Sequence, residues 1–524
     1  MRLADIAGLR RSYRAFNAAL GSLYESDLLE LAGATDKPGF DDTAFFDAAG
    51  MVYRAGGFDA SQLNTPEARR LIAETLNQLN TAISSGIDHE VPETVRYALE
   101  NNAFIFSGFK AYHTLREVGL SLTTDKGDIK PFETFRRDVE AVNKQYNHSY
   151  LYAEYNHAVG ASLMASRWQK IEKDGDRYDL QYRTAGDDRV REDHAILNGT
   201  TLPPSDPFWS LYLPPNGWNC RCTAVQVRKG KYEQSDPDLA MQRGNNCTEA
   251  AKQQIFRFNP GKTLQLFPPK HPYFKAPAEV KQVVEQLSEE QKREQRIAEM
   301  ITELPSHLTE AEKKAIATHN LEIEKVLGIT KGKPKTVEQA DEQSANPNYG
   351  KDRSFGINCQ TCAPAYALRL LGFDVTAKAN TRGSLSEYLS RQHSFEAWSN
   401  ADGSKPTPSL TYDWMVAKGY KLMNKKRYEE YFNECCNETG VYILTIGWKG
   451  GGGHATILQR FEDGTLSYIE PQVYDKKTGA RRSIDELCNY GSAKPIRTRG
   501  VLRVDNKLFN TKFASIFEVK TNNP

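Results

Sequence analysis

The first third of the chain repeats one pattern of apolar and polar positions. In Pro66–Asn80, apolar residues recur at helical spacing behind a proline and an early acid, which predicts an amphipathic helix. Pro92–Ala111 and Pro131–Trp168 repeat this arrangement. Tyrosines and histidines gather between positions 146 and 157, and we interpret them as helix packing rather than as a ligand site. Residues 1–177 are therefore predicted to form a mainly helical region.

The pattern changes after residue 177. Tyr178–Arg183 alternates as a strand does, and a second strand is predicted at Ala224–Val227. Between them lie a turn, a short helix and a loop interrupted by several prolines. Residues 178–277 therefore predict a small module that contains β-strands.

The loops of this module carry a series of spaced motifs. They are Gly186-Asp187-Asp188-Arg189-Val190-Arg191 with His194, Asn198-Gly199, Asp206-Pro207-Phe208-Trp209, Pro214-Pro215-Asn216-Gly217-Trp218-Asn219-Cys220-Arg221-Cys222, Phe258-Asn259-Pro260-Gly261-Lys262 and His271-Pro272-Tyr273-Phe274. Together they resemble the phage Mu F-like minor head proteins, a head morphogenesis family, over roughly residues 50–275. The resemblance implies a minor capsid protein whose partners are the phage portal and other capsid proteins. It also implies a location in the cytoplasm during assembly and in the virion head afterwards.

Three residues of these motifs are of metal-ligand types, namely His194, Cys220 and Cys222, with aspartates nearby. Paired zinc-binding cysteines are usually separated by two to four residues, whereas Cys220 and Cys222 have one residue between them. We therefore expect no metal here, but two buried thiols, with Arg221 paired to an acid such as Asp187.

Residues 278–344 are rich in charge and predict two helices, the second capped at Thr309. Interspersed charges are typical of a solvated helix face. Ile329–Lys351 contains almost no apolar residues and is interpreted as a linker. Residues 278–344 are therefore predicted to be a helical and polar linker that leads into a last domain, residues 345–524.

The last domain opens with a stretch, Gly356–Gly372, that begins as a polar loop and continues as a helix. Its apolar residues Ala363, Tyr366, Ala367, Leu370 and Leu371 share one helical face. Gly372 suits the position after the last turn. Pro364 lacks an N–H group and is expected in the first turn, which puts Cys359 at or just before the helix N-terminus. The free N–H groups and the helix dipole there favour a thiolate.

A histidine and a carboxylate follow downstream. Gly450–Gly453 directly precede His454, which opens a predicted strand, and the strand that returns leads to Glu470. This order predicts Cys359 as nucleophile, His454 as the base that takes and returns the proton, and Glu470 as the group that orients His454. Backbone N–H groups at the helix start would bind the oxyanion.

The hairpin register leaves the third member open. With a four-residue loop centred on Asp463-Gly464, Glu470 faces away from His454, whereas a one-residue bulge restores a shared face. Gln472 is the alternative third member. Cys362 is the rival nucleophile, one turn after Cys359. A Cys-x-x-Cys redox or metal pair is a further alternative, although no second pair with matching spacing supports it.

This segment resembles the papain-fold toxin family (Tox-PL, glutamine-deamidase-like) over about residues 345–505. The likeness is carried by Asn358-Cys359 with Cys362, Leu368-Arg369-Leu370-Leu371-Gly372-Phe373-Asp374-Val375, Gly453-His454-Ala455, and Asp463-Gly464 leading to Glu470-Pro471-Gln472. It implies a papain-like α+β domain and a cysteine hydrolase of a protein substrate, either a glutamine deamidase or a peptidase. Cys359, His454 and Glu470 would be catalytic, with Asn358 and Gln472 as auxiliary residues.

Composition argues against several classes of protein. The chain has 68 Lys and Arg against 67 Asp and Glu, a net charge of +1, so no general attraction to nucleic acid or membranes is expected. The mean hydropathy is −0.62, and we find no apolar run of membrane-spanning length and no secretory signal. Eight cysteines suggest no disulfide framework.

We therefore predict a multidomain α+β protein that works without a cofactor. It would be a phage or prophage minor head protein that carries a C-terminal papain-fold enzyme, a deamidase or toxin. Two alternatives stay open. The C-terminal domain could be an inactive attachment on a structural protein, or a cysteine peptidase that acts in head maturation.

Overall fold

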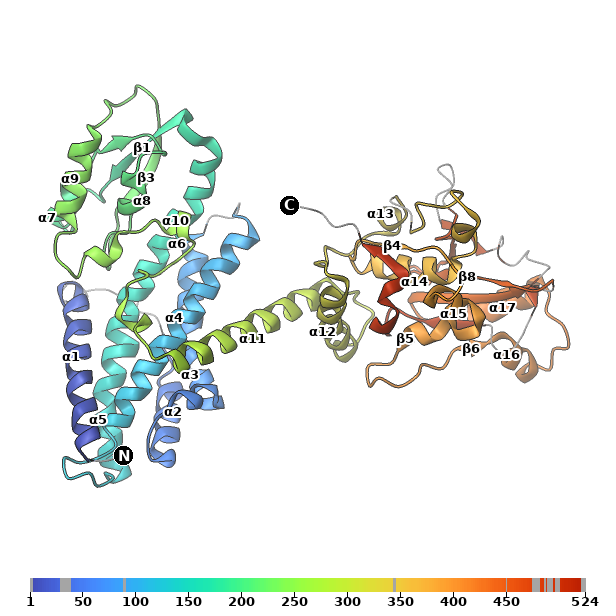
Figure 1. The fold of residues 1–524 in the computed structure, drawn as a ribbon, viewed down its shortest axis with the longest axis horizontal. Helices are drawn as coiled ribbons and strands as arrows, with labels where there is room; N and C mark the ends of the chain where they lie inside the picture. Colours follow the sequence, from blue (N-terminus) through green and yellow to red (C-terminus); the bar gives the residue numbers. More distant parts are fainter. Residues whose placement is uncertain are drawn as a thin grey trace. The chain divides into compact units, whose positions relative to one another are not determined.

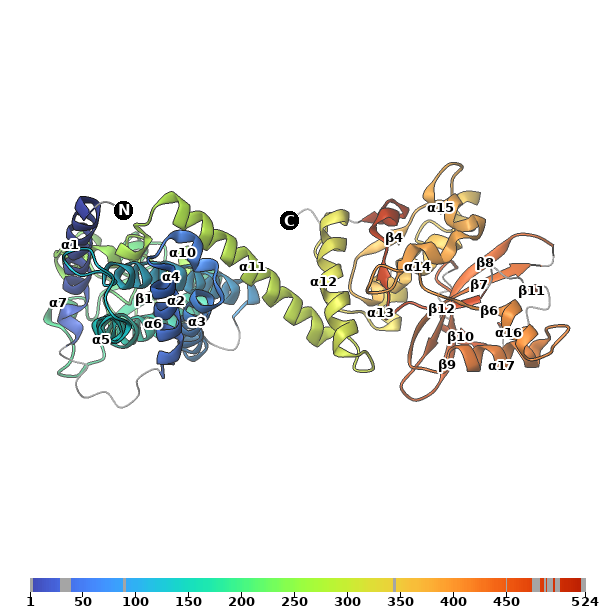
Figure 2. The ribbon, with the colours of Figure 1, turned by 90° about the horizontal axis from the view of Figure 1, so that it is seen from below.

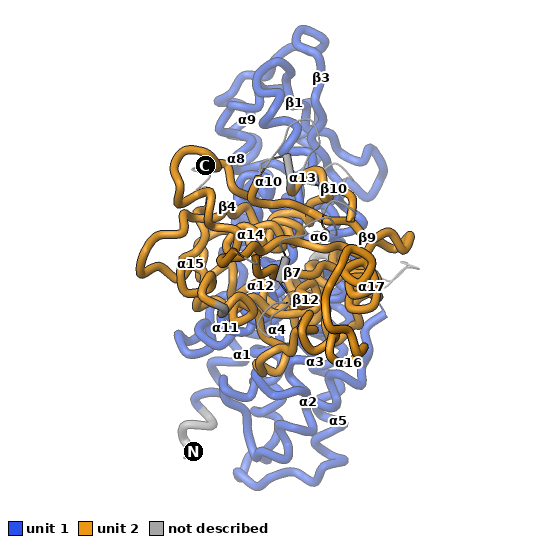
Figure 3. Tube along the Cα trace, turned by 90° about the vertical axis from the view of Figure 1, so that its right-hand side faces the viewer, with its two compact units in different colours: residues 1–292 blue, residues 293–524 orange. Residues whose placement is uncertain are grey.

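A computed structural model describes residues 3–28, 39–87, 91–342, 345–448, 450–473, 481–484, 487, 493–494 and 500–519. The chain divides into two compact units, residues 1–292 and 293–524 (Figure 3). Helices dominate the first unit and antiparallel sheets are prominent in the second, so the predicted α+β class is confirmed. The four sequence-based segment boundaries stay a prediction. Within the described residues, no helix combines the length and the apolar character that crossing a membrane requires.

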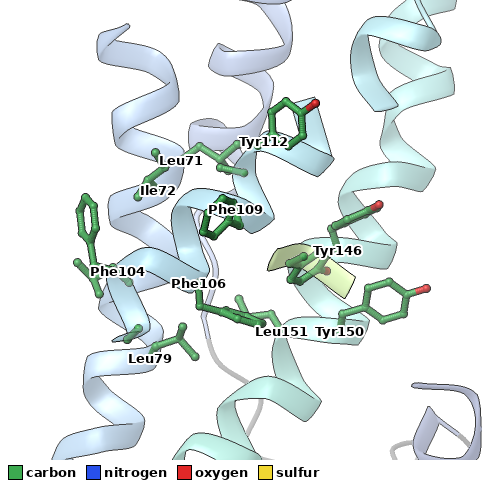
Figure 4. Close-up of a cluster of buried hydrophobic side chains, with 14 of the residues drawn as sticks. Leu71, Ile72, Leu79, Phe104, Phe106, Phe109, Tyr112, Tyr146, Tyr150 and Leu151 are labelled. Carbon is green, nitrogen blue, oxygen red and sulfur yellow. The ribbon is translucent and has the colours of Figure 1, made fainter. Parts of the chain in front are cut away.

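The first unit begins with long helices. They are α1 (Leu3–Leu28), α2 (Asp42–Ala55), α3 (Pro66–Gly86), α4 (Glu93–Leu120), α5 (Phe132–Asn143) and α6 (Leu151–Asp174). Helix α3 lies beside both α4 and α6 (Figure 2). Their apolar faces meet in one core, in which Leu71 and Leu79 of α3 pack with Phe106 of α4 and Leu151 of α6 (Figure 4).

The helices predicted from the proline pattern are confirmed, with one interruption. Helix α3 begins at Pro66, and α4 begins directly after Pro92. The third predicted helix is divided into α5 and α6 by a π-helical turn over Lys144–Tyr150. Tyr146 and Tyr150 in this turn are buried in the core, as the packing interpretation of the aromatic run predicts.

The small module follows α6. It contains β1 (Tyr178–Arg183), α7 (Glu192–Ala195), β2 (Thr201–Leu202), α8 (Phe208–Tyr212), β3 (Thr223–Arg228), α9 (Pro237–Cys247) and α10 (Pro260–Thr263). Strands β1 and β3 confirm the two predicted strands and lie side by side as an antiparallel pair (Figure 1). Strand β2 pairs with the other edge of β1, so the order of the sheet is β2-β1-β3. Helix α10 packs on α6, where Gly261 lies so close to Trp168 that an added Cβ would meet the Trp168 Cβ at 2.1 Å.

Two charged helices come next, as predicted: α11 (Ala278–Glu303) and α12 (Glu310–Leu327). Thr309 and Glu312 form the reciprocal cap at the start of α12. The polar segment after α12 lies within the second unit, where Gly332 N donates to Gly372 O (3.0 Å).

The second unit is built on an antiparallel sheet with helices. After α12 it contains α13 (Val337–Glu342), α14 (Cys359–Leu370), β4 (Val375–Ala377), α15 (Leu385–Tyr388), β5 (Trp398–Ser399), β6 (Ser409–Leu410), α16 (Thr411–Ala417), α17 (Lys425–Cys435), β7 (Gly440–Trp448), β8 (Gly453–Arg460), β9 (Leu466–Ile469), β10 (Arg481–Ser483), β11 (Ala493–Lys494), β12 (Gly500–Arg503), β13 (Leu508–Phe509) and β14 (Phe517–Val519). The main sheet has the order β10-β9-β8-β7-β12-β6, and β11 pairs with β7.

Alternate residues of the central strands enter two different cores. Ile443, Ile457 and Ile469 join the cluster that contains the buried face of α14. Their sequence neighbours, such as Leu458, join the cluster that contains Phe432 of α17. Helix α14 therefore packs on the central strands, which brings its N-terminus towards the start of β8.

Candidate active site and candidate metal centre

The predicted nucleophile begins a helix. Helix α14 starts at Cys359, and Thr361 N and Cys362 N donate to Asn358 O (2.9 and 3.1 Å). The N–H groups of Cys359 and Gln360 come at the very start, where a helix has no intrahelical acceptor. They are therefore the available donors beside the Cys359 sulfur.

The helix departs from the prediction at Pro364. This residue is the sixth of α14 and not part of its first turn. Because proline has no N–H group, Gln360 O lacks its usual intrahelical donor, yet the helix continues to Leu370 because its apolar face is buried. Gly372 adopts φ +106° directly after Leu371, the C-cap of the helix, as predicted for the residue that follows the last turn.

The two cysteines of α14 lie in different surroundings. Cys362 is fully buried and donates its Sγ–H to Asn358 Oδ1 (3.3 Å). Burial raises the pKa of the Cys362 thiol well above its usual value, so this side chain is a neutral thiol. Cys359 keeps 8% of its surface exposed. The surroundings therefore favour Cys359 over Cys362 as a nucleophile.

His454 and Glu470 form a buried pair. His454 Nε2 lies 2.7 Å from Glu470 Oε2, and the two side chains are 13% and 5% exposed. The Glu470 carboxylate also accepts from Tyr468 OH (2.5 Å) and Gln472 N (3.0 Å). Burial alone would raise the pKa of Glu470, but the bond and charge of His454, with these two donors, lower it below its usual value. Glu470 is thus an ionised carboxylate.

His454 also interacts with Cys359. Burial lowers the pKa of His454, but hydrogen bonds to Cys359 and Glu470, together with the electrostatic interactions with these two side chains, raise it to about 10. The ring is therefore protonated at neutral pH. Because Nε2 faces Glu470, Nδ1 is the ring nitrogen left for the Cys359 sulfur. The Trp448 ring lies nearly parallel to the imidazole, at 15° and 6.5 Å between centroids.

The hairpin register determines whether Glu470, the predicted third member, shares a face with His454. Phe461 N donates to Thr465 O (2.9 Å), so the pairing continues one position past the ends of β8 and β9, and a three-residue loop, residues 462–464, closes the hairpin. Gly464 adopts φ +80° in this loop. In the ladder, Leu458 pairs with Tyr468, so positions 454 and 470 fall on one face as diagonal neighbours. The shared face that the sequence left open is therefore present.

Gln472, the alternative third member, has another partner. Its Nε2 donates to Asn358 Oδ1 (3.3 Å), which also accepts from Asn346 Nδ2 (3.2 Å). Asn358 Nδ2 in turn donates to Lys378 O (3.1 Å). Asn346, Asn358 and Gln472 are all buried, and together they fix the residue that precedes Cys359.

Sequence reasoning missed Tyr468, Trp448 and Asn346. Tyr468 lies two positions before Glu470 in a strand, so strand alternation could have placed both on one face. Asn346 belongs to a polar segment interpreted as a linker, and no local pattern marks it as a partner of Asn358.

The second candidate cluster lies in the small module. His194 of α7 meets Cys220 and Cys222, which lie in the segment that leads into β3. The distances from His194 Nδ1 are 3.5 Å to Cys220 Sγ and 3.7 Å to Cys222 Sγ. The three ligand atoms lie within 4.8 Å of one another, and all three residues are buried.

The intervening Arg221 points to another partner. Its guanidinium binds both oxygens of Asp187 (2.5 and 2.6 Å), which confirms the predicted pair. The hydrogen bond from Arg221 lowers the pKa of Asp187 to about 2. The loop that carries Asp187 is thereby attached to the Cys220–Cys222 segment.

Comparison with known proteins covers part of the first unit. A family described as Phage Mu protein F like protein matches residues 129–225. Capsid assembly protein F of Escherichia phage Mu is 38% identical over 69 residues, which are 13% of this chain and 16% of that relative. No solved structure matches this chain at a significant level.

The papain-fold likeness of residues 345–505 stays a prediction. The phage Mu F-like likeness, expected over roughly residues 50–275, is confirmed over residues 129–225. This segment contains β1, β2, the start of β3 and the His194, Cys220 and Cys222 cluster. Residues 129–225 are thus similar to the Phage Mu protein F like family.

Proposed function

We propose that this chain takes part in phage head assembly and that its second unit is a papain-like cysteine hydrolase. The first part is supported by the likeness of residues 129–225 to Phage Mu protein F like proteins and by a relative named as a capsid assembly protein. Its partners would be the portal and other capsid proteins, and it would reside in the virion head.

One observation carries the hydrolase proposal. The protonated ring of His454 interacts with the Cys359 sulfur and with the Glu470 carboxylate. A positive charge beside a thiol at a helix N-terminus favours the thiolate, which is the nucleophilic form. Glu470 is itself fixed by Tyr468 and by the Gln472 backbone, so the ring is held in one orientation.

The chemistry follows from these positions. The Cys359 thiolate attacks the carbonyl carbon of an amide, and the carbonyl electron pair moves to the oxygen. The N–H groups of Cys359 and Gln360 at the start of α14 would bind this oxyanion. His454 gives its proton to the leaving nitrogen, and a thioester remains. His454 then takes a proton from water, which attacks the thioester and releases the acid and the Cys359 sulfur.

The leaving group defines the substrate class. With a glutamine side chain the leaving group is ammonia, and the product is glutamate. With a peptide bond it is the amine of the next residue. We favour a glutamine deamidase acting as a toxin on a protein, because of the resemblance of Asn358-Cys359 and Gly453-His454-Ala455 to the papain-fold toxins. A peptidase of head maturation is the second candidate, since it uses the same thioester route.

The first test measures nucleophile activation in the full-length protein. Iodoacetamide labelling of Cys359 would be followed by peptide mass spectrometry across pH 5–9. Fast labelling near pH 6 is expected, slowed in His454→Ala and unaffected in the control Cys362→Ala. Labelling that rises only near the usual thiol pKa of about 8.5, with no dependence on His454, would support an inactive domain.

The second test identifies the reaction. Head proteins and host proteins would be compared after exposure to wild type and to Cys359→Ala. A glutamine-to-glutamate mass change supports the deamidase, and clipped capsid chains support the peptidase. Normal head assembly with Cys359→Ala would separate the hydrolase from the assembly role. If neither modification depends on Cys359, the hydrolase proposal fails.

A further inference from the structure

We propose that His194, Cys220 and Cys222 form a zinc site in the first unit, with three protein ligands and a fourth position open to a small cavity. The site is separate from the proposed hydrolase and serves the small module. Imidazole nitrogen and thiolate sulfur are the ligands that zinc prefers.

The spacing of the ligand atoms fits a tetrahedral ion. With Zn–S of about 2.3 Å and Zn–N of about 2.0–2.1 Å, tetrahedral angles place sulfur and nitrogen about 3.6 Å apart. The observed distances from His194 Nδ1 to the two sulfurs are 3.5 and 3.7 Å. Nδ1 of His194 can carry only one proton, so it cannot make good hydrogen bonds to both sulfurs. One metal ion, in contrast, can bind the nitrogen and both sulfurs at once.

The surrounding structure holds the ligands in place. Asp193 Oδ1 accepts from His194 N (2.9 Å), and Asp193 Oδ2 accepts from Gln253 Nε2 (2.6 Å), which fixes the α7 segment. Cys222 directly precedes β3, whose Thr223 pairs with Arg183 of β1. The ligands thus come from two segments that are already attached to the module.

A cavity of about 20 Å³ is lined by all three ligands and by Arg189 and Arg191, among others. This volume exceeds the roughly 10–15 Å³ that one water requires. A fourth ligand such as water therefore has room beside the ion. Two thiolates also balance the charge of Zn²⁺, which makes the buried site neutral.

Arg191 must move when the metal binds. Its Nη2 lies 3.3 Å from His194 Nε2, and because a guanidinium only donates, a neutral ring in this contact carries its proton on Nδ1. Coordination through Nδ1 requires that proton to leave Nδ1. The neutral ring then carries its proton on Nε2, which faces the guanidinium, so Arg191 has to move away. Arg191 also lines a second cavity of about 570 Å³ together with Glu192 and Asp193, which offers space and negative charge for the displaced guanidinium.

The site would connect residues that are distant in sequence. His194 and Cys220 are 26 positions apart, and the intervening chain contains β2 and α8. A metal that joins them closes this loop onto the sheet. Metal binding should therefore raise the melting temperature of the first unit.

The test uses the full chain, stripped with a chelator and titrated with Co²⁺. One cobalt per chain is expected, with thiolate-to-cobalt charge-transfer absorption and the intense visible bands of a tetrahedral site, both displaced by Zn²⁺. The bands should be lost in Cys220→Ser, Cys222→Ser and His194→Asn. They should persist in Cys247→Ser, a buried cysteine of the same core that is outside the cluster, and in Cys359→Ala/Cys362→Ala.

Two outcomes would overturn the site. One is wild-type protein that binds neither Co²⁺ nor Zn²⁺ after stripping. The other is a cobalt spectrum that survives in Cys222→Ser and His194→Asn, which would place the metal elsewhere. Because the wild-type spectrum is measured directly, a variant that fails to fold does not decide the question. Arg191→Ala should bind Co²⁺ more tightly than wild type, and weaker binding would contradict the displacement of Arg191.

Discussion

His454 Nε2 lies 2.7 Å from Glu470 Oε2, although the two residues are not directly paired in the β8–β9 ladder. They are diagonal neighbours on one face because an odd number of residues, 462–464, closes the hairpin. The same carboxylate accepts a hydrogen bond from Tyr468, so the partner of His454 is itself held by a neighbour two positions earlier in the chain.

The charge of Glu470 should control the reactivity of Cys359. Glu470→Gln keeps the size of the side chain but removes the negative charge that raises the pKa of His454. We expect slower alkylation of Cys359 at pH 6–7, roughly tenfold for each unit by which the pKa of His454 falls below the measuring pH. Iodoacetamide kinetics would measure this. Glu462→Gln, in the loop of the same hairpin, is the control, and an equal effect there would argue against a specific role of Glu470.

The stability of the second unit should fall at alkaline pH. The pKa of His454 is raised from 6.5 to about 10 in the folded chain. The folded state therefore holds this proton where the unfolded state releases it, so the stabilisation is complete below pH 6.5 and is lost as pH approaches 10. Denaturant unfolding at pH 6, 8 and 9.5 would measure the decline. The decline should be smaller in His454→Gln than in wild type, and the control His393→Gln should decline as wild type does. A decline in His454→Gln as steep as that of wild type would exclude His454 as its source.

The loop before His454 should require glycine. Gly452 adopts φ +74°, a region that costs a residue with a side chain about 1–2 kcal/mol. Gly452→Ala should lower the melting temperature of the second unit and slow Cys359 labelling, because His454 follows two residues later. Gly356→Ala is the matched control, since nothing lies within 4 Å of the added Cβ and Gly356 has no positive φ. Equal losses in both variants would show that backbone strain is not the cause.

The first unit should depend strongly for its stability on the buried ion pair between Lys110 and Glu154. Lys110 and Glu154 contact each other and are 1% and 0% exposed, and Tyr24 OH also donates to Glu154 (2.8 Å). Lys110→Met leaves a buried carboxylate without its counter-charge and should cost about 3–5 kcal/mol of unfolding free energy. Lys110→Met/Glu154→Gln should recover part of this loss, which denaturant unfolding would measure.

The exposed pair Arg54–Glu67 provides the comparison, with side chains 66% and 32% exposed. Arg54→Ala should change the unfolding free energy by only about 0–1 kcal/mol, because water screens the pair. A loss for Lys110→Met as small as that for Arg54→Ala would mean that Glu154 becomes neutral or hydrated in the variant.

The sequence by itself determined what depends on local order. Proline and apolar spacing predicted α3 and α4, and the apolar face with Gly372 predicted α14 and its end. Cys359 falls at the helix start because a polar loop changes there to helical periodicity. Residue type and spacing also predicted the order of Cys359, His454 and Glu470. They predicted the pair of Arg221 with Asp187 as well.

Only the tertiary structure decided the rest. Strand periodicity is two residues, so a single extra residue in the hairpin loop would have moved Glu470 to the other face, and no local pattern fixes that number. Cys362 is fully buried whereas Cys359 keeps some exposed surface, although they are only three positions apart, because α14 packs one side on the sheet. His194 meets Cys220 and Cys222, 26 and 28 positions later in the chain, only because packing on the β1–β3 sheet brings the two segments together.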